Sequence, residues 1–336
     1  MIEEAIKQLV EKKDLTAELV GTTMEEIMTG QAHRSQLAAY LALLRIKGET
    51  VEEITASTEV MRRHVTKISS SEEIILDTCG TGGDSSGTFN VSTISALVAV
   101  GAGIVVAKHG NRSVSSKCGS ADLLVQLGVR IDLSPEAMQQ CLQEIGFSFL
   151  YAPLLHPAMQ YATPVRREIG IRTIFNILGP LTNPAGASNQ LLGVYNASLT
   201  EVLAGVLKNL GSRHVLVVHG EDGLDEVTTT GKTKISELKD GKIKTYQIKP
   251  GQFGIKPVKP EELKGGDPTL NARIAYDILK GRGEAKRDAV LLNAGCAIYA
   301  ADQAASIQEG VIKAAESIDS GKALEKLELL KQFTNK

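Results

Sequence analysis

Apolar residues recur at helical spacing through the first 70 residues of the chain. Four stretches (residues 6–10, 19–28, 37–44 and 51–65) each place their apolar side chains on one side of a helix with 3.6 residues per turn. Thr50 followed by Glu53 has the spacing of a capping box at the start of the last stretch. The pattern therefore predicts a small all-helical bundle over residues 1–70.

Beyond residue 70 the pattern changes to short apolar runs of β type, separated by longer helical stretches. The runs are Ile74–Leu76, Ile104–Val106, Leu191–Val194, Val215–Val218 and Ala289–Leu292. Because these runs are apolar on both faces and alternate with helices, they predict a mostly parallel central sheet flanked by helices. A charged stretch from Lys239 to Gly266 is predicted to be a surface excursion with one or two short strands. The expected fold class is α/β, with a small N-terminal helical domain and a large sheet-containing domain.

Composition and charge limit the ligands to be considered. The 336 residues, 43% of them hydrophobic, suffice for one large or two ordinary globular domains. Lys and Arg number 37 against 39 Asp and Glu, so the net charge of -2 gives no general attraction for nucleic acid or an anionic membrane. Four cysteines without CxxC spacing favour a reducing cytoplasm and no cysteine-bound zinc. We expect a cytoplasmic protein without a nucleic-acid or membrane partner, in which local charge holds any anionic ligand.

Polar segments follow three of the predicted strands directly. Asp77 follows the first run, Lys108 the second, and His219 the run at residues 215–218. Ligands of open α/β sheets bind outside the carboxyl ends of the strands. The three segments are therefore expected to form one site at one edge of the sheet.

The first segment contains a glycine turn, Gly80–Gly83, whose backbone N–H groups can approach an anion closely. It is neither a Walker A loop, because no Gly-Lys-Ser/Thr follows, nor GxGxxG, because Ser85 replaces the last glycine. Asn90, Ser92 and Thr93 precede a predicted helix, whose N-terminus beside this turn would suit a phosphate. The alternatives are an ordinary tight turn and simple N-capping.

Positive charge is concentrated in two later segments. Residues Lys108–Lys117 contain three cations and no acid, which suits a polyanion but also an ordinary solvated loop. Arg166, Arg167 and Arg172 lie close together in sequence, and one arginine can hold a carboxylate through two parallel hydrogen bonds. Surface ion pairing with Glu168 is the alternative for this cluster.

Asp225 and Glu226 are adjacent acids on a glycine-containing loop. On a strand they would point to opposite faces, but on such a loop both can turn to one side. Magnesium is typically bound through one or two carboxylates plus substrate phosphates. An exposed acidic pair without function is the alternative, and the position after His219 at a strand end favours a metal site.

Together these segments resemble the anthranilate phosphoribosyltransferases, which are class III phosphoribosyltransferases. The resemblance spans nearly the whole chain and rests on Gly80–Asp84, Thr88–Thr93, Lys108–Gly119, Pro164–Glu168 and Asp222–Glu226. It implies a helical domain of residues 1–70, completed by a helical segment at about 165–190, and an α/β phosphoribosyl-binding domain of residues 71–164 and 191–336. It further implies a homodimer formed through the helical domain.

The activity implied by the resemblance is a step of tryptophan biosynthesis. The phosphoribosyl group of 5-phosphoribosyl-1-pyrophosphate (PRPP) passes to the amine of anthranilate, and pyrophosphate is released with the help of magnesium. No protein nucleophile is needed. His109 could assist removal of the proton, or could be a hydrogen-bonding residue in the wall of the site.

The resemblance also assigns residues to ligands. Two magnesium ions per active site are expected, one on Ser92 and Glu226 and the second on Asp225 and Glu226. Anthranilate is expected to contact Asn111 and Arg166, with Gly80, His109, His156 and Tyr161 lining its path. The residues expected to bind PRPP are Gly80, Gly83, Asp84, Thr88, Asn90, Val91, Ser92, Thr93, Lys108, His109, Gly110, Asn111, Arg112, Ser113, Val114, Ser115, Ser116 and Ser120.

Two other functions fit parts of the sequence. A pyrimidine nucleoside phosphorylase has a similar architecture and also cleaves at C1 of ribose, but it needs no paired carboxylates for a metal-bound pyrophosphate. A noncatalytic nucleic-acid-binding relative would be expected to carry a basic surface and a degraded acidic loop. The net charge of -2 and the intact Asp225–Glu226 pair argue against the latter.

Overall fold

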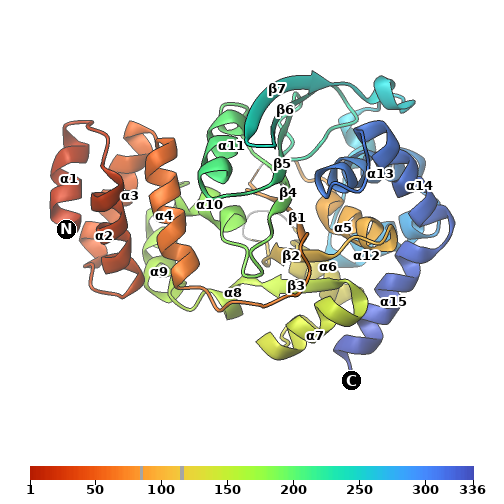
Figure 1. Ribbon diagram of the computed structural model, residues 1–336, viewed down its shortest axis with the longest axis horizontal. Helices are drawn as coiled ribbons and strands as arrows, with labels where there is room; N and C mark the ends of the chain where they lie inside the picture. Colours follow the sequence, from red (N-terminus) through yellow and green to blue (C-terminus); the bar gives the residue numbers. More distant parts are fainter. Residues whose placement is uncertain (84–85, 114–116) are drawn as a thin grey trace.

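The computed structural model describes residues 1–83, 86–113 and 117–336. Four N-terminal helices form a bundle at one end of the molecule (Figure 1). They are α1 (Ile2–Val10), α2 (Ala17–Met28), α3 (Arg34–Lys47) and α4 (Val51–Arg63). The predicted capping box is present, because the Thr50 hydroxyl accepts from the Glu53 N–H at 3.2 Å and the Glu53 carboxylate accepts from the Thr50 N–H at 2.8 Å.

Two helices from the middle of the chain complete this bundle. Helices α9 (Met159–Ile169) and α10 (Phe175–Leu178) place Ala162, Val165 and Phe175 in the same apolar core as α1 to α4. The short elements next to them are α8 (Ala152–Leu155) and the 3₁₀ turn η1 (Gly179–Leu181). The chain thus leaves the sheet, passes through the bundle and returns.

A sheet of seven strands, counted within the described residues, forms the centre of the large domain in the order β3-β2-β1-β4-β5-β6-β7. The first five strands in this order are parallel, β6 is antiparallel to β5, and β7 is antiparallel to β6. The strands are β1 (Leu76–Gly80), β2 (Val106–Gly110), β3 (Phe147–Tyr151), β4 (Asn189–Gly193), β5 (His214–Gly220), β6 (Thr233–Lys239) and β7 (Lys242–Ile248).

Helices cover the sheet, and one of them, α5, is buried almost all round (Figure 1). Helix α5 (Val91–Gly101) packs with α13 and α15 against β1 and β2, while α11 covers β5 and β6 on the bundle side. The remaining elements of the domain are α6 (Ser120–Gln126), α7 (Pro135–Ile145), α11 (Leu199–Asn209), α12 (Pro268–Leu279), α13 (Glu284–Ala300), α14 (Ile307–Asp319), α15 (Lys322–Thr334), η2 (Pro250–Phe253) and η3 (Pro260–Leu263). The predicted fold class is confirmed.

Several predicted elements were wrong in detail. The run Ala289–Leu292 lies inside α13, because this helix is buried over most of its length and its apolar residues show no helical period. The strand β3 was not predicted, and β6 begins at Thr233, before the expected excursion. The strands also run further than their apolar runs, so Asp77, Lys108 and His219 are strand residues rather than loop residues. In the described part of the chain, the helices are all too short or too polar to cross a membrane.

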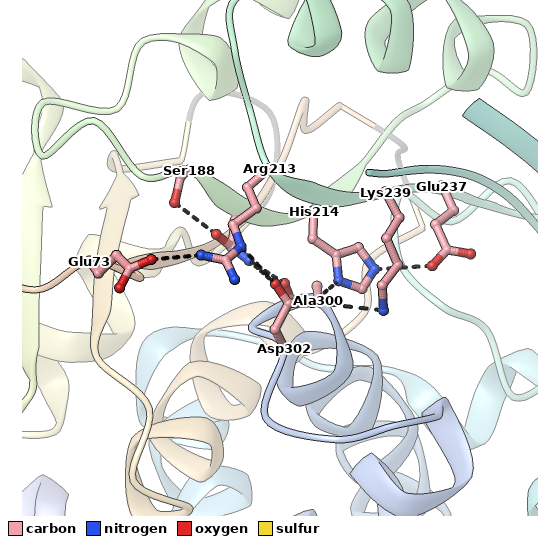
Figure 2. Close-up of polar contacts among 9 residues, drawn as sticks. Glu73, Ser188, Arg213, His214, Glu237, Lys239, Ala300 and Asp302 are labelled. Carbon is pink, nitrogen blue, oxygen red and sulfur yellow. Dashed lines mark hydrogen bonds and ion pairs between the residues drawn. The ribbon is translucent and has the colours of Figure 1, made fainter. Parts of the chain in front are cut away.

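A buried polar cluster joins the antiparallel strands to the rest of the sheet at the edge where the parallel strands begin (Figure 2). His214 is fully buried, with Nδ1 2.7 Å from Asp302 Oδ1 and Nε2 3.0 Å from Glu237 Oε1. The Tyr299 hydroxyl also donates to Glu237 Oε1 at 2.7 Å, and Arg213 Nε lies 3.1 Å from Asp302 Oδ2. The hydrogen bonds from His214 and Tyr299 favour the charged form of Glu237.

Acid is expected to weaken the fold through Glu237. Burial opposes the charge on this carboxylate, but hydrogen bonds from His214, Tyr299 and Tyr246 outweigh it and lower its pKa to about 2. This pKa lies below the ordinary value of about 4.3 for glutamate. The ionised carboxylate therefore stabilises the fold at pH values above the ordinary pKa, and the stabilisation is lost as the pH falls through the lowered pKa. The free energy of unfolding of the variant Glu237→Gln should be about 3 kcal/mol lower near neutral pH, and it should fall less steeply as the pH is lowered. Urea unfolding at a series of pH values measures both.

The matched control for this prediction is Glu316→Gln, at an exposed position of α14. It should unfold like the unsubstituted chain at every pH. If Glu237→Gln also follows the unsubstituted chain, the cluster does not stabilise the fold in this way.

Candidate active site

The carboxyl ends of β1 and β4 lie side by side and carry glycines where they meet. Gly80 pairs with Gly193 in the parallel ladder, and the loop with Asp225 lies directly over both. A Cβ atom on Gly80 would lie 2.5 Å from Asp225 Oδ2, and one on Gly193 would lie 1.6 Å from the Asp225 carbonyl oxygen. Only glycine at these positions lets the acidic loop approach the strand ends so closely.

The buried Asn293 of α13 fixes the other end of this loop. Its amide accepts from the Val227 N–H at 2.9 Å and donates to the Val227 carbonyl oxygen at 2.7 Å. Asn293 is fully buried, so the pairing is shielded from water. Sequence reasoning missed both Gly193 and Asn293; the glycine within an apolar strand run was the available signal for the first.

Replacing Gly193 by alanine is expected to displace the acidic loop, because the added methyl group would overlap its backbone. Turnover should fall by at least about 100-fold, the range expected when catalytic groups move by about 1 Å. The control is Gly186→Ala. A Cβ atom there would meet nothing within 4 Å, so the strain of placing alanine at a positive φ is the cost of that substitution. Steady-state kinetics on both variants decide the point: similar losses in the two would mean that the close approach at Gly193 has no special importance.

Asp225 and Glu226 contact the two segments that were predicted to bind phosphate. Asp225 Oδ2 accepts from the Gly82 N–H at 2.7 Å, and Glu226 Oε1 accepts from the Ser92 N–H at 3.3 Å. The structure therefore brings together the glycine turn, the start of α5 and both acids, including the three predicted metal ligands Ser92, Asp225 and Glu226. Among the described residues, no group of three or more His, Cys, Asp or Glu side chains could hold a metal ion alone. Two carboxylates and a hydroxyl suit a magnesium ion that takes its other ligands from phosphate and water.

Lys108 lies beneath the site rather than on its surface. Its side chain is buried, and Nζ donates to the Thr78 carbonyl oxygen and lies 3.4 Å from Ser92 Oγ. Burial lowers the pKa of Lys108, while the nearby charges of Asp77 and Glu226 oppose the shift. Asp77 is itself buried and accepts from Asn183 Nδ2 at 2.8 Å, and burial raises its pKa to about 6. In this structure Lys108 positions the strand ends and Ser92.

His109 and His156 form a buried neutral pair. Their Nε2 atoms are 3.0 Å apart, and His109 Nδ1 is 3.2 Å from the Gly179 carbonyl oxygen. Burial lowers the pKa of His109 to about 3, helped by His156, and that of His156 to about 4. Because a carbonyl only accepts, His109 donates from Nδ1, and its Nε2 then accepts from His156. The lone pair of His109 is thus engaged, which favours the wall role over that of proton acceptor.

Two of the residues predicted to bind anthranilate or line its path, Arg166 and Tyr161, lie on α9, and their surroundings differ from each other. The Arg166 guanidinium carbon lies 5.4 Å from the centre of the Phe175 ring, and burial lowers the pKa of Arg166. Tyr161 packs its ring against Gly30 of the bundle and stays 45% exposed. Ion pairing with Glu168 was the alternative for this cluster; among the described residues, the ion pair that Glu168 forms is with Arg34, at 3.5 Å.

The loop after β2 is organised by Asp122, which sequence reasoning did not single out. Its carboxylate accepts from the N–H groups of Ser113 at 3.1 Å and Gly119 at 2.9 Å, and from Arg112 Nη1 at 2.9 Å. The Ser120 hydroxyl donates to the Asn111 carbonyl oxygen at 3.2 Å. Asp122 therefore folds the described part of the loop back onto the start of α6. The predicted ligands Asp84, Val114, Ser115 and Ser116 lie outside the described residues.

The residues at the start of α5 do not act as simple side-chain caps. Asn90 is the N-cap residue without a capping bond; its amide instead donates to the Cys118 carbonyl oxygen at 3.0 Å and accepts from Asn271 at 2.9 Å. The Thr88 hydroxyl lies 3.0 Å from that of Ser86. Val91 and Thr93 are buried in the first turn, next to Ser92. The start of α5 thus lies beside the glycine turn, where a helix N-terminus favours a negative group; here the Ser92 N–H binds Glu226 and the Val91 N–H binds the Phe89 carbonyl oxygen.

The two domains and this site define the chain as a glycosyl transferase. Residues 3–65 match the family model described as the helical bundle domain of a glycosyl transferase family, and residues 72–324 match the model of its α/β domain. The anthranilate phosphoribosyltransferase of Alkaliphilus metalliredigens is 53% identical over 330 residues, which cover 98% of this chain and 97% of the relative. That of Acetivibrio thermocellus is 50% identical over 100% of this chain and 97% of the relative. The chain belongs to the anthranilate phosphoribosyltransferase family.

Solved structures agree with this assignment. The anthranilate phosphoribosyltransferase (TrpD) of Thermus thermophilus superposes with a TM-score of 0.93 at 42% identity, over 99% of each chain. The Saccharomyces cerevisiae enzyme in complex with PRPP and Mg superposes with a TM-score of 0.91 at 30% identity, over 99% of this chain and 98% of that one. The likeness extends over both domains.

Proposed function

We propose that this protein transfers the 5-phosphoribosyl group of PRPP to the amine of anthranilate, a step of tryptophan biosynthesis. The observation that carries the proposal is the meeting of three segments at one sheet edge: the glycine turn, the N-terminus of α5 and the Asp225–Glu226 pair, joined by the bonds to Gly82 and Ser92. The glycine turn and the helix N-terminus favour negative groups, and the two carboxylates beside them suit a hard cation. Whole-chain relatives at about 50% identity carry the same activity in their names.

Magnesium fits the residues present at this site. Two ions per active site are proposed, one on Ser92 and Glu226 and the other on Asp225 and Glu226. When bound, magnesium supplies positive charge against the negative charge that develops on the departing pyrophosphate. The Saccharomyces cerevisiae relative has been solved with PRPP and Mg, which supports the choice of cation.

The remaining chemistry needs orientation more than acid–base catalysis. The C1–O bond of the donor breaks, its electron pair leaves with pyrophosphate, and the amine nitrogen of anthranilate forms the new bond to C1 and then loses a proton. The aromatic amine is weakly basic, so it reaches the site unprotonated. The proposed roles are positional: Arg166 holds the anthranilate carboxylate, Asn111 and Gly80 border the ring, and the neutral His109–His156 pair walls the site without adding a charge.

The glycine turn, the start of α5 and the loop after β2 are proposed to hold the donor. The residues are those expected from the sequence: Gly80, Gly83, Asp84, Thr88, Asn90, Val91, Ser92, Thr93, the segment Lys108–Ser116, whose buried Lys108 supports the site from beneath, and Ser120. Asp122 supports this proposal, because it orders Arg112 and Ser113 directly after the carboxyl end of β2.

Loss of anthranilate fluorescence on addition of PRPP and magnesium tests the activity. One pyrophosphate should appear for each anthranilate consumed, and omission of magnesium should stop both. Uridine or thymidine with inorganic phosphate is the control for the phosphorylase alternative, and no free base should form. Release of base without consumption of anthranilate would favour that alternative instead.

The domain division, cellular location and assembly are proposals as well. Residues 1–70 with about 165–190 are proposed as one domain and residues 71–164 with 191–336 as the other, supported by the contacts of α9 with α2 and α3. A cytoplasmic location is supported by four cysteine thiols. A homodimer through the helical domain is proposed from the resemblance to the anthranilate phosphoribosyltransferases. Analytical ultracentrifugation would show the dimer.

A further inference from the structure

Arg172 connects the helical domain to the glycine turn of the site. It lies between α9 and α10, and its Nη2 donates to the carbonyl oxygen of Gly83. Its guanidinium carbon also lies 4.1 Å from the centre of the Tyr195 ring, in the segment that follows β4. A planar guanidinium can donate at its edge and stack on its face at once, which a lysine ammonium cannot.

The turn has few means of holding its own shape. Gly82 and Gly83 both have positive φ, at 67° and 74°, in a region that glycine enters freely but does not favour over others. The turn is instead held by neighbouring segments: the Thr81 N–H donates to the Gly193 carbonyl oxygen at 2.9 Å, and the Thr81 hydroxyl accepts from the Tyr195 N–H at 3.1 Å. Asp225 binds the Gly82 N–H from the other side.

Arg172 completes this support at the last described residue of the turn. A Cβ atom on Gly83 would lie 2.9 Å from Arg172 Nη2, so the guanidinium lies directly against the glycine backbone. Tyr195 contributes twice, because its backbone binds Thr81 and its ring carries Arg172. Arg172 and Tyr195 thus connect the helical domain to Thr81 and Gly83 of the turn.

We propose that Arg172 is a positioning residue for the donor substrate, which holds the glycine turn in the conformation that receives the phosphates of PRPP. The inference rests on the proposed function for the identity of the donor. When the turn is already ordered, less of the free energy of substrate binding is lost in ordering it. Loss of Arg172 should therefore weaken the binding of the donor and leave the binding of anthranilate largely unchanged.

Isothermal titration of magnesium-saturated PRPP, together with the KM of each substrate, tests the proposal. Arg172→Ala should raise the dissociation constant and the KM of PRPP by about tenfold, with the KM of anthranilate and the thermal midpoint nearly unchanged. Arg172→Lys should recover only part of the loss, because it keeps the charge but not the stacking. Tyr195→Phe should behave like the unsubstituted chain, and Tyr195→Ala should reproduce much of the Arg172→Ala effect.

The matched control is Arg167→Ala, which removes an exposed arginine of the neighbouring helix α9. It should leave both substrates unaffected. Unchanged PRPP binding in Arg172→Ala would overturn the proposal, and so would an equal loss for both substrates with a lowered thermal midpoint, since this indicates a merely structural role. If the unsubstituted chain binds PRPP but does not consume anthranilate, the proposed function fails while the binding data still test Arg172. If it binds no PRPP, both fail.

Discussion

Glu226→Gln is expected to lower kcat/KM by at least about 100-fold, and Asp225→Asn is expected to lower it by a similar factor. Each amide keeps an oxygen that can accept the backbone bond seen here, from Ser92 to Glu226 and from Gly82 to Asp225. The substitutions therefore remove charge while retaining the contacts that shape the loop. A neutral pair binds a divalent cation weakly, so the magnesium concentration for half-maximal rate should rise as well.

Titration of the rate with magnesium, at saturating PRPP and anthranilate, measures both effects. Glu221→Gln is the matched control, because this exposed acid follows β5 as the acidic pair does but accepts from the Lys232 N–H, at 3.2 Å. It should leave the magnesium dependence unchanged. Normal magnesium dependence in both Asp225→Asn and Glu226→Gln would remove these acids from the metal site.

Arg166→Ala is expected to raise the KM of anthranilate by at least about 100-fold. A carboxylate held through two charge-assisted bonds would lose about 1.5–3 kcal/mol for each bond. Arg166 is mostly buried over Phe175, and burial lowers its pKa, so its guanidinium is poorly hydrated and suited to a charged ligand. Arg166→Lys should rescue little, because lysine cannot make the parallel pair of bonds.

Initial rates at varied anthranilate and fixed PRPP check this prediction. Arg167→Ala, the exposed neighbour, serves again as the control. An unchanged KM of anthranilate in Arg166→Ala, or an equal change in the KM of PRPP, would contradict the assigned role.

The architecture could be predicted because hydrophobic period and loop chemistry agree over most of the chain. The parallel strands follow from short runs that are apolar on both faces, and their order places the phosphate and acid segments at one edge. The run Ala289–Leu292 misled the prediction, because a helix buried all round and a buried strand have the same composition over four residues. Strand ends were placed too early, since buried polar residues such as Asp77 and Lys108 resemble loop residues in sequence.

The parts of the site that were missed depend on contacts between distant segments. Asp122 acts by folding back on its own loop, and Asn293 reaches the acidic loop from a helix 66 positions away. Arg172 meets Gly83 across 89 positions. No local pattern marks such residues, because their partners are defined only once the chain has folded. The predicted ligands themselves were identifiable because their residue types, rather than their contacts, carry the chemistry.

The central claim is that the Asp225–Glu226 loop and the glycine turn enclose a cation together with the donor pyrophosphate. A crystal structure with PRPP and Mn²⁺, whose anomalous signal locates the ion, tests it most directly. We expect an anomalous peak within about 2.5 Å of a Glu226 carboxylate oxygen and of a pyrophosphate oxygen, a distance typical of hard-cation coordination, with the phosphates at the glycine turn and the start of α5. An ion bound away from both acids, or a donor bound away from the turn, would contradict the account.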